Sequence, residues 1–232
     1  MAALRGPACA HRDLPVLPEQ ARHCSKVTLA ENTTRIPSAT LRRGLVPAVG
    51  LVLVMLVIQL LPLGWQNALQ YDRPAMAQGE YWRLLTSNFV HLGWSHFALN
   101  VAGLALILWI FGADRPAWRW GLGLLLASIT TSLGVHLFSP GIFWMVGLSG
   151  ALHGLFVLGA LGWIMAGDRL GWGLLAGVAA KLLFEQTMGE VPFTAAIVGG
   201  SVVTDAHLCG AFGGLLAALL ELGNWRKRAS SL

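Results

Sequence analysis

Two polar side chains in apolar stretches of this sequence, Ser149 and His207, are of the types that form a nucleophile and its base. Ser149 lies in Gly147-Leu148-Ser149-Gly150, at the start of one apolar stretch, and His207 lies inside a later one. Polar and ionisable groups are costly in lipid and usually functional there. A serine hydroxyl whose proton passes to an imidazole can attack a carbonyl carbon. The pair therefore predicts a serine nucleophile and a histidine base working within a membrane.

The position of Ser149 in its stretch suits a nucleophile. The preceding segment, 139–148, contains Pro140 and Gly141, so a helix is expected to begin at about Ser149. The amide groups at a helix N-terminus stabilise negative charge that develops during a reaction. An isolated serine at such a position can also serve only as a helix N-cap. The catalytic interpretation therefore depends on the other polar residues of the set.

His96 and Asn100 are a second polar pair, four residues apart, and so lie one above the other on one helix face. Both side chains can donate hydrogen bonds. Two stacked donors that face a nucleophile meet the requirement of an oxyanion hole. Polar contacts between helices are the alternative interpretation of this pair.

Other polar residues near the predicted pair receive secondary roles. His153 follows Ser149 by four residues, so it shares a helix face with it and can contact His207 or hydrogen-bond within the site. Asp205 is two residues from His207, about 200° around a helix, so the two side chains point apart. We therefore expect a Ser-His dyad with no carboxylate member. Lys181 and Glu185 are expected to neutralise each other as an i,i+4 pair, and contact with a substrate is the alternative role for them.

Glycines at regular spacing predict where two helices pack closely. Gly150 and Gly154 are four residues apart after Ser149, and Gly210 and Gly214 are four residues apart after His207. Small residues at this spacing let membrane helices approach each other. Such an approach would bring Ser149 near His207.

Composition places these residues in a membrane. Hydrophobic residues make up 55% of the 232 residues and charged residues 12%, about half the charged fraction of a soluble domain. A spanning helix needs roughly 17–25 mostly apolar residues, and six stretches qualify: Leu45–Leu63, Leu92–Phe111, Trp120–Phe138, Ser149–Met165, Leu170–Thr187 and Val202–Leu222. The sequence predicts an all-α polytopic membrane protein with six transmembrane helices. No metal-ligand spacing is present, and no metal or cofactor is expected.

The distribution of basic residues predicts how the chain is oriented in the membrane and on which side its two termini lie. With a cytoplasmic N-terminus, the loops on that side carry Arg42, Arg43, Arg115, Arg119, Arg169, Arg226, Lys227 and Arg228, and the other side carries only Arg73 and Arg83. The positive-inside rule then puts both termini in the cytoplasm. This bias accounts for the net charge of +5 without a nucleic-acid partner. Residues 1–40 are expected to form a flexible cytosolic tail, 41–224 the membrane domain and 225–232 a short basic tail.

Four motifs together resemble the rhomboid family of intramembrane serine proteases. They occur within residues 45–223, in the family's order: Trp82-Arg83, His96-x-x-x-Asn100, Gly147-Leu148-Ser149-Gly150 and Ala206-His207-x-x-Gly210-x-x-x-Gly214. The resemblance implies a six-helix rhomboid-like bundle with Ser149 as nucleophile and His207 as general base. It also implies an oxyanion hole made by His96, Asn100 and the Ser149 amide, and transmembrane proteins as substrates in the lipid bilayer.

At one position the sequence departs from the common rhomboid pattern and resembles the rhombosortase branch. Many rhomboids have a tyrosine where this chain has His153, in the run Gly-Leu-Ser-Gly-Ala-Leu-His-Gly, and the segment from Lys181 to Gln186 is also similar to that branch. The resemblance implies a bacterial enzyme of the inner membrane. With both termini in the cytoplasm, the polar residues of alternate helices are expected near the outer leaflet, so the active site is expected towards the periplasmic face. Its substrates would be exported proteins with a C-terminal Gly-Gly sorting tail.

Two other classes of function remain as alternatives. A catalytically silent rhomboid-like protein would bind membrane proteins and guide their trafficking, but such proteins usually lack the serine or the histidine, and both are present here. A transporter would be expected to show an inverted repeat or a pair of broken helices, and neither is found in the sequence.

Overall fold

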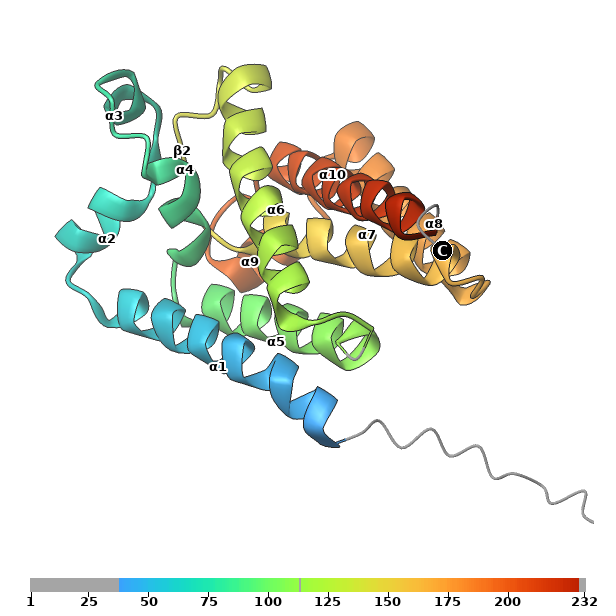
Figure 1. The fold of residues 1–232 in the computed structure, drawn as a ribbon. Helices are drawn as coiled ribbons and strands as arrows, with labels where there is room; N and C mark the ends of the chain where they lie inside the picture. The colour runs from blue at the N-terminus through green and yellow to red at the C-terminus, as the bar shows by residue number, and fades with distance from the viewer. Residues whose placement is uncertain (1–37, 113, 230–232) are drawn as a thin grey trace, which may run out of the picture. The chain divides into compact units, whose positions relative to one another are not determined.

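The computed structural model describes residues 38–112 and 114–229, which are mostly helical (Figure 1). The long helices are α1 (Ser38–Leu60), α5 (Trp94–Phe111), α6 (Ala117–Phe138), α7 (Ser149–Met165), α8 (Leu170–Met188) and α10 (Thr204–Ala229). The short elements are α2 (Leu63–Leu69), α3 (Arg73–Ala77), α4 (Arg83–Thr86), the 3₁₀ turn η1 (Ser87–Phe89), α9 (Thr194–Val198), and the strands β1 (Tyr71–Asp72) and β2 (Trp144–Met145).

A long helix covers each of the six apolar stretches, with ends that differ by at most seven residues. The largest differences are at the ends of α1 and α10. α1 begins at Ser38, inside the range expected to be a tail; the rest of that range lies outside the described residues. α10 continues to Ala229, so residues 225–229 are helical where a basic tail is expected.

Three of these helices are long and apolar enough to cross a membrane by length and composition. They are α5, α6 and the Thr204–Leu222 part of α10. Val46–Leu60 and α7 are apolar but shorter. Large apolar side chains are exposed on all three spanning helices, for example Trp109, Leu137 and Phe212. Exposed apolar surface of this extent suits contact with lipid, and we conclude that the chain is a multi-pass membrane protein.

α10 packs against both α6 and α7, and glycines make the contact with α7 close (Figure 1). A Cβ atom at Gly210 would overlap the carbonyl oxygen of Gly150, and one at Gly214 would overlap that of Gly154. The two backbones therefore touch without intervening side chains. This contact sets the separation of the two helices that carry Ser149 and His207.

The segment between α1 and α5 is an ordered set of short elements. β1 pairs antiparallel with β2, with Tyr71 opposite Met145. The guanidinium of Arg73 donates to four carbonyl oxygens at and beyond the C-terminal end of α6, of Val135, His136, Ser139 and Ile142, at 2.8–3.0 Å. Arg73 thereby satisfies carbonyl groups that the end of a helix leaves without partners. These contacts fix the segment that leads into Ser149.

Candidate active site

Ser149 and His207 are hydrogen-bonded to each other. The Nε2 atom of His207 lies 3.0 Å from the Ser149 Oγ atom, and His207 is 5% exposed. The two residues come from α7 and α10, which the glycine contact holds together. A nucleophile within hydrogen-bond distance of a base is the geometry that proton transfer requires.

The turn before Ser149 needs glycine for two reasons. Gly147 has φ = +115°, which side chains other than glycine rarely adopt. A Cβ atom there would also lie 2.6 Å from the His96 ring. The Gly147 amide donates to the Ser87 carbonyl at 3.0 Å, so the turn is tied to η1. Like the first amides of any α-helix, those of α7, including that of Ser149, have no carbonyl partner in a preceding turn.

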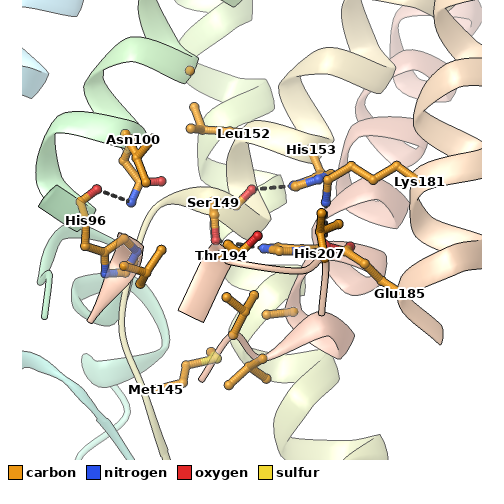
Figure 2. A pocket seen from close by; sticks show the side chains of 18 of the residues that line it. His96, Asn100, Met145, Ser149, Leu152, His153, Lys181, Glu185, Thr194 and His207 are labelled. Atoms are coloured by element: carbon orange, nitrogen blue, oxygen red, sulfur yellow. Dashed lines mark hydrogen bonds and ion pairs between the residues drawn. The ribbon is translucent and has the colours of Figure 1, made fainter. Parts of the chain in front are cut away.

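The other predicted donors, His96 and Asn100, lie on α5 beside this turn (Figure 2). The His96 ring is in van der Waals range of Gly147, and the Asn100 amide nitrogen is slightly farther from it. The Leu92 amide donates to His96 Nδ1 at 3.3 Å, so in the neutral ring the proton is on Nε2, the atom beside Gly147. Asn100 donates one amide hydrogen to the His96 carbonyl at 3.1 Å and has a second hydrogen to offer.

His91 supports His96 and does not reach the nucleophile. Its ring packs edge to face against those of His96 and Phe97, with ring centres 5.1 and 5.6 Å away. Burial, and secondarily the nearby His96 ring, lowers the pKa of His91 to about 3. A neutral ring therefore holds His96 in place.

His153 lies against the face of the predicted base. Its ring is stacked on that of His207, with centres 4.2 Å apart and planes at 21° (Figure 2). Its Nδ1–H group donates to the carbonyl oxygen of Ser149 at 2.7 Å. This bond fixes the ring, and the stacking limits how His207 can tilt.

Glu185 is the site residue that sequence reasoning misses. It is 3% exposed on α8, and its Oε2 atom accepts a hydrogen bond from His207 Nδ1 at 2.9 Å. Its Oε1 atom accepts one from Lys181 at 2.6 Å, which is the expected i,i+4 pair. Asp205 points away from His207 and bonds Ser139 at 2.5 Å. A carboxylate thus contacts the base where a dyad without one is expected, and it comes from another helix.

The cluster of His153, Glu185 and His207 has the residue types of a metal site, because one ligand atom from each lies within 4.8 Å of the others. Its geometry does not fit one. The lone pairs of two nearly parallel stacked rings do not converge on one point, as tetrahedral coordination at about 2 Å requires. The Lys181 ammonium, bonded to Glu185, adds a positive charge beside any cation.

One cavity of about 1140 Å³ is lined by His96, Asn100, Ser149, His153, Lys181, Glu185 and His207. Small-molecule sites usually have volumes of about 300–1,000 Å³, so there is space for an extended peptide. α9 and the following residues 199–203 border the cavity near Ser149. It continues along α5 to Leu106 and along α8 to Gly173 and Gly177, where a Cβ atom would meet open space.

Comparisons with known proteins agree with one another. Residues 78–224 match the rhomboid domain family. The chain is 33% identical over 175 residues to rhomboid protease GluP and 25% identical over 158 residues to putative rhomboid protease YdcA, both of Bacillus subtilis. It is 33% identical over 142 residues to rhomboid-like protease 5 of Toxoplasma gondii. The matches cover 69%, 67% and 60% of this chain, and 31%, 75% and 16% of those relatives.

Proposed function

Since the chain belongs to the rhomboid family, we propose that it is an intramembrane serine endopeptidase that cleaves membrane-anchored proteins within or next to their transmembrane segment. The observation that carries the proposal is the 3.0 Å hydrogen bond between Ser149 and His207 inside a large, mostly apolar cavity. The similarity to three proteins named as proteases supports it.

The first half of the reaction is acylation of Ser149. His207 Nε2 takes the hydroxyl proton while Oγ attacks the scissile carbonyl carbon, giving a tetrahedral oxyanion. The imidazolium then gives this proton to the leaving nitrogen, the C–N bond breaks, and an ester to Ser149 remains. In the second half His207 activates a water molecule, which hydrolyses the ester and restores the hydroxyl. The residues in the cavity supply every proton transfer without a metal or cofactor.

The oxyanion is stabilised by donors on two sides. The Ser149 amide comes from the start of α7, and His96 Nε2–H and the free Asn100 amide hydrogen come from α5. Donors fixed in a site with little water stabilise developing charge without having to reorganise.

We expect Asn100→Ala to lower kcat on the order of 10²-fold, with a much smaller change in KM, because the lost donor acts mainly on the transition state. Cleavage of a purified transmembrane reporter in liposomes measures both constants. Trp109→Phe, on the same helix at a position that is 80% exposed, is the matched control and should leave both unchanged. A rise in KM with an unchanged kcat would show that Asn100 only binds substrate.

The shape of the cavity favours a helical membrane anchor as the substrate. The cavity continues away from Ser149 between apolar side chains of α5 and the open surface at Gly173 and Gly177 of α8. We propose that the anchor enters from the lipid between these helices and unwinds near Ser149, since an intact helix buries its peptide bonds in hydrogen bonds.

The proposed topology has six spans, both termini in the cytoplasm, and the active site towards the periplasmic face of a bacterial inner membrane. The charge bias supports it. Arg115 and Arg119 precede and begin α6, whereas Ser149 follows the other end of α6. The site is thus at the end of the bundle opposite these arginines.

The proposed substrate class is the exported protein with a C-terminal Gly-Gly sorting tail. The run from Gly147 to Gly154 and the Lys181–Gln186 segment support it by resemblance to rhombosortases. Glycine near the cleaved bond also lowers the cost of unwinding, because it is a poor helix former.

The test is co-expression of the full chain, or its Ser149→Ala form, with a reporter that ends in a glycine-rich motif, an apolar helix and an arginine cluster. Serine-dependent release of the reporter is the expected result. If only a general rhomboid substrate is cut, the protease proposal stands and the Gly-Gly proposal is wrong. If a well-expressed protein cuts neither, both are wrong, and the silent, membrane-protein-binding alternative becomes the one to pursue.

A further inference from the structure

We propose that Glu185 is a positioning residue for His207, so that the site works as a Ser149–His207–Glu185 triad with Lys181 as the counter-charge of the carboxylate. This inference rests on the proposed proteolytic function. It concerns the tautomer, the orientation and the protonation of His207, and it replaces the expected Ser-His dyad with a triad.

The first argument is the tautomer of His207. A carboxylate can only accept a hydrogen bond, so the contact of 2.9 Å with Glu185 requires the proton on His207 Nδ1. The lone pair is then on Nε2, which faces the Ser149 hydroxyl at 3.0 Å. Glu185 therefore selects the form of the neutral ring that can take a proton from Ser149.

The second argument is the orientation of the ring. His207 is held at both nitrogens, by Glu185 and Ser149, and on one face by His153. Without Glu185 the ring could rotate about its χ2 angle and withdraw Nε2 from the hydroxyl. A structural link between α8 and α10 would not need to end at the nitrogen opposite the nucleophile.

The third argument is charge. When Ser149 gives up its proton, His207 becomes an imidazolium in an apolar cavity, where an isolated charge is costly. Glu185 supplies a negative charge in contact with it. In the resting state Lys181, 2.6 Å from the same carboxylate, balances that charge. The carboxylate thus stays ionised at low exposure and stabilises the imidazolium when it forms.

The charged and titratable groups around His207 determine the expected pH effects. α8 presents Glu185 and Lys181, α7 presents His153, and α5 carries His96 on the other side of Ser149. α6 carries Arg119 and His136 near its two ends, and α10 itself carries Asp205, which bonds Ser139. Among these, Glu185 is the carboxylate bonded to His207.

The test measures how fast a fluorophosphonate reacts with the full chain in liposomes, across the acid to alkaline pH range. The Ser149 oxygen bonds to phosphorus, fluoride leaves, and His207 takes the proton, so no protein substrate is needed. Glu185→Gln should slow the reaction by a factor on the order of 10⁴, as the wrong histidine tautomer does in triad proteases. The acidic limb of its pH profile should move to lower pH, because the imidazolium has lost its negative neighbour and kept Lys181.

Lys181→Met should move the acidic limb of the pH profile in the opposite direction. The carboxylate then faces His207 without a counter-charge, so the imidazolium is more stable and the acidic limb should move to higher pH. Thr187→Ala, at an exposed position on α8 that does not line the cavity, is the matched control and should leave rate and profile unchanged. A purely structural role of the Lys181–Glu185 pair predicts lower thermal stability in both variants and no pair of opposite pH shifts.

Each outcome decides between the proposals. Wild-type rate and profile in Glu185→Gln, or a slow reaction with an unmoved acidic limb, would overturn the triad and leave the protease proposal intact. Wild-type protein that does not react, or that reacts equally as Ser149→Ala, would overturn both. If Glu185→Gln does not fold, Lys181→Met decides alone: a shift to higher pH supports the triad, and no shift overturns it.

Discussion

Replacing Ser149 with alanine should lower the rate of substrate cleavage by about 10⁶-fold, which amounts to complete loss in most assays. In the proposed mechanism the hydroxyl oxygen forms the acyl-enzyme, so its loss removes the nucleophile. The helices should pack as before, because the backbone contacts that hold α7 against α10 are made by Gly150 and Gly154. Cleavage of a reporter by purified protein in liposomes, with a thermal unfolding curve for each variant, measures both effects.

Ser128→Ala is the matched control for this prediction. Ser128 is a fully buried serine on α6 that does not line the cavity, so its loss removes a similar hydroxyl from the same bundle. It should retain cleavage. Substantial serine-independent cleavage by a purified Ser149→Ala protein would contradict the proposed mechanism.

Replacing His207 with alanine should cost about as much as replacing Ser149, since nucleophile and base act as a unit. Without Nε2 the hydroxyl proton has no acceptor at 3.0 Å. The double variant Ser149→Ala/His207→Ala should therefore be no slower than either single variant. Steady-state cleavage rates of the three proteins, measured together, provide the comparison.

Two further variants separate chemistry from packing at this position. His207→Phe keeps a ring against His153 and should be as inactive as His207→Ala. His136→Ala changes a histidine that bonds Tyr71 outside the cavity and should keep its activity. If His207→Phe cleaved at a rate near that of wild type, the role of His207 would be packing alone.

The parts of the fold that were predictable are those recorded in local sequence. Each long helix coincides with an apolar stretch, because hydropathy over about twenty residues is a property of that stretch alone. The pair of Ser149 and His207 could be identified because each lies in a recognisable motif. The short elements between α1 and α5 could not be predicted, because Arg73 and β1 depend on partners near the end of α6 and in β2.

The contact of Glu185 with His207 could not be predicted from the sequence. Sequence alone pairs it with Lys181, because i,i+4 neighbours on a helix are close whatever the rest of the chain does. Its second bond, to His207, depends on how α8 is rotated relative to α10. Asp205 is near His207 in sequence, but helix geometry predicts that the two side chains point apart, and Asp205 bonds Ser139 instead.

The glycine contact between α7 and α10 also bears on when the protein gains activity during biosynthesis. Ser149 leaves the ribosome well before His207, and the two meet only after α10 has inserted and its glycines have closed on those of α7. The nascent chain therefore holds a nucleophile without its base for as long as α8 and α9 are being made. On the proposed mechanism, the site would therefore become active only when the bundle is complete.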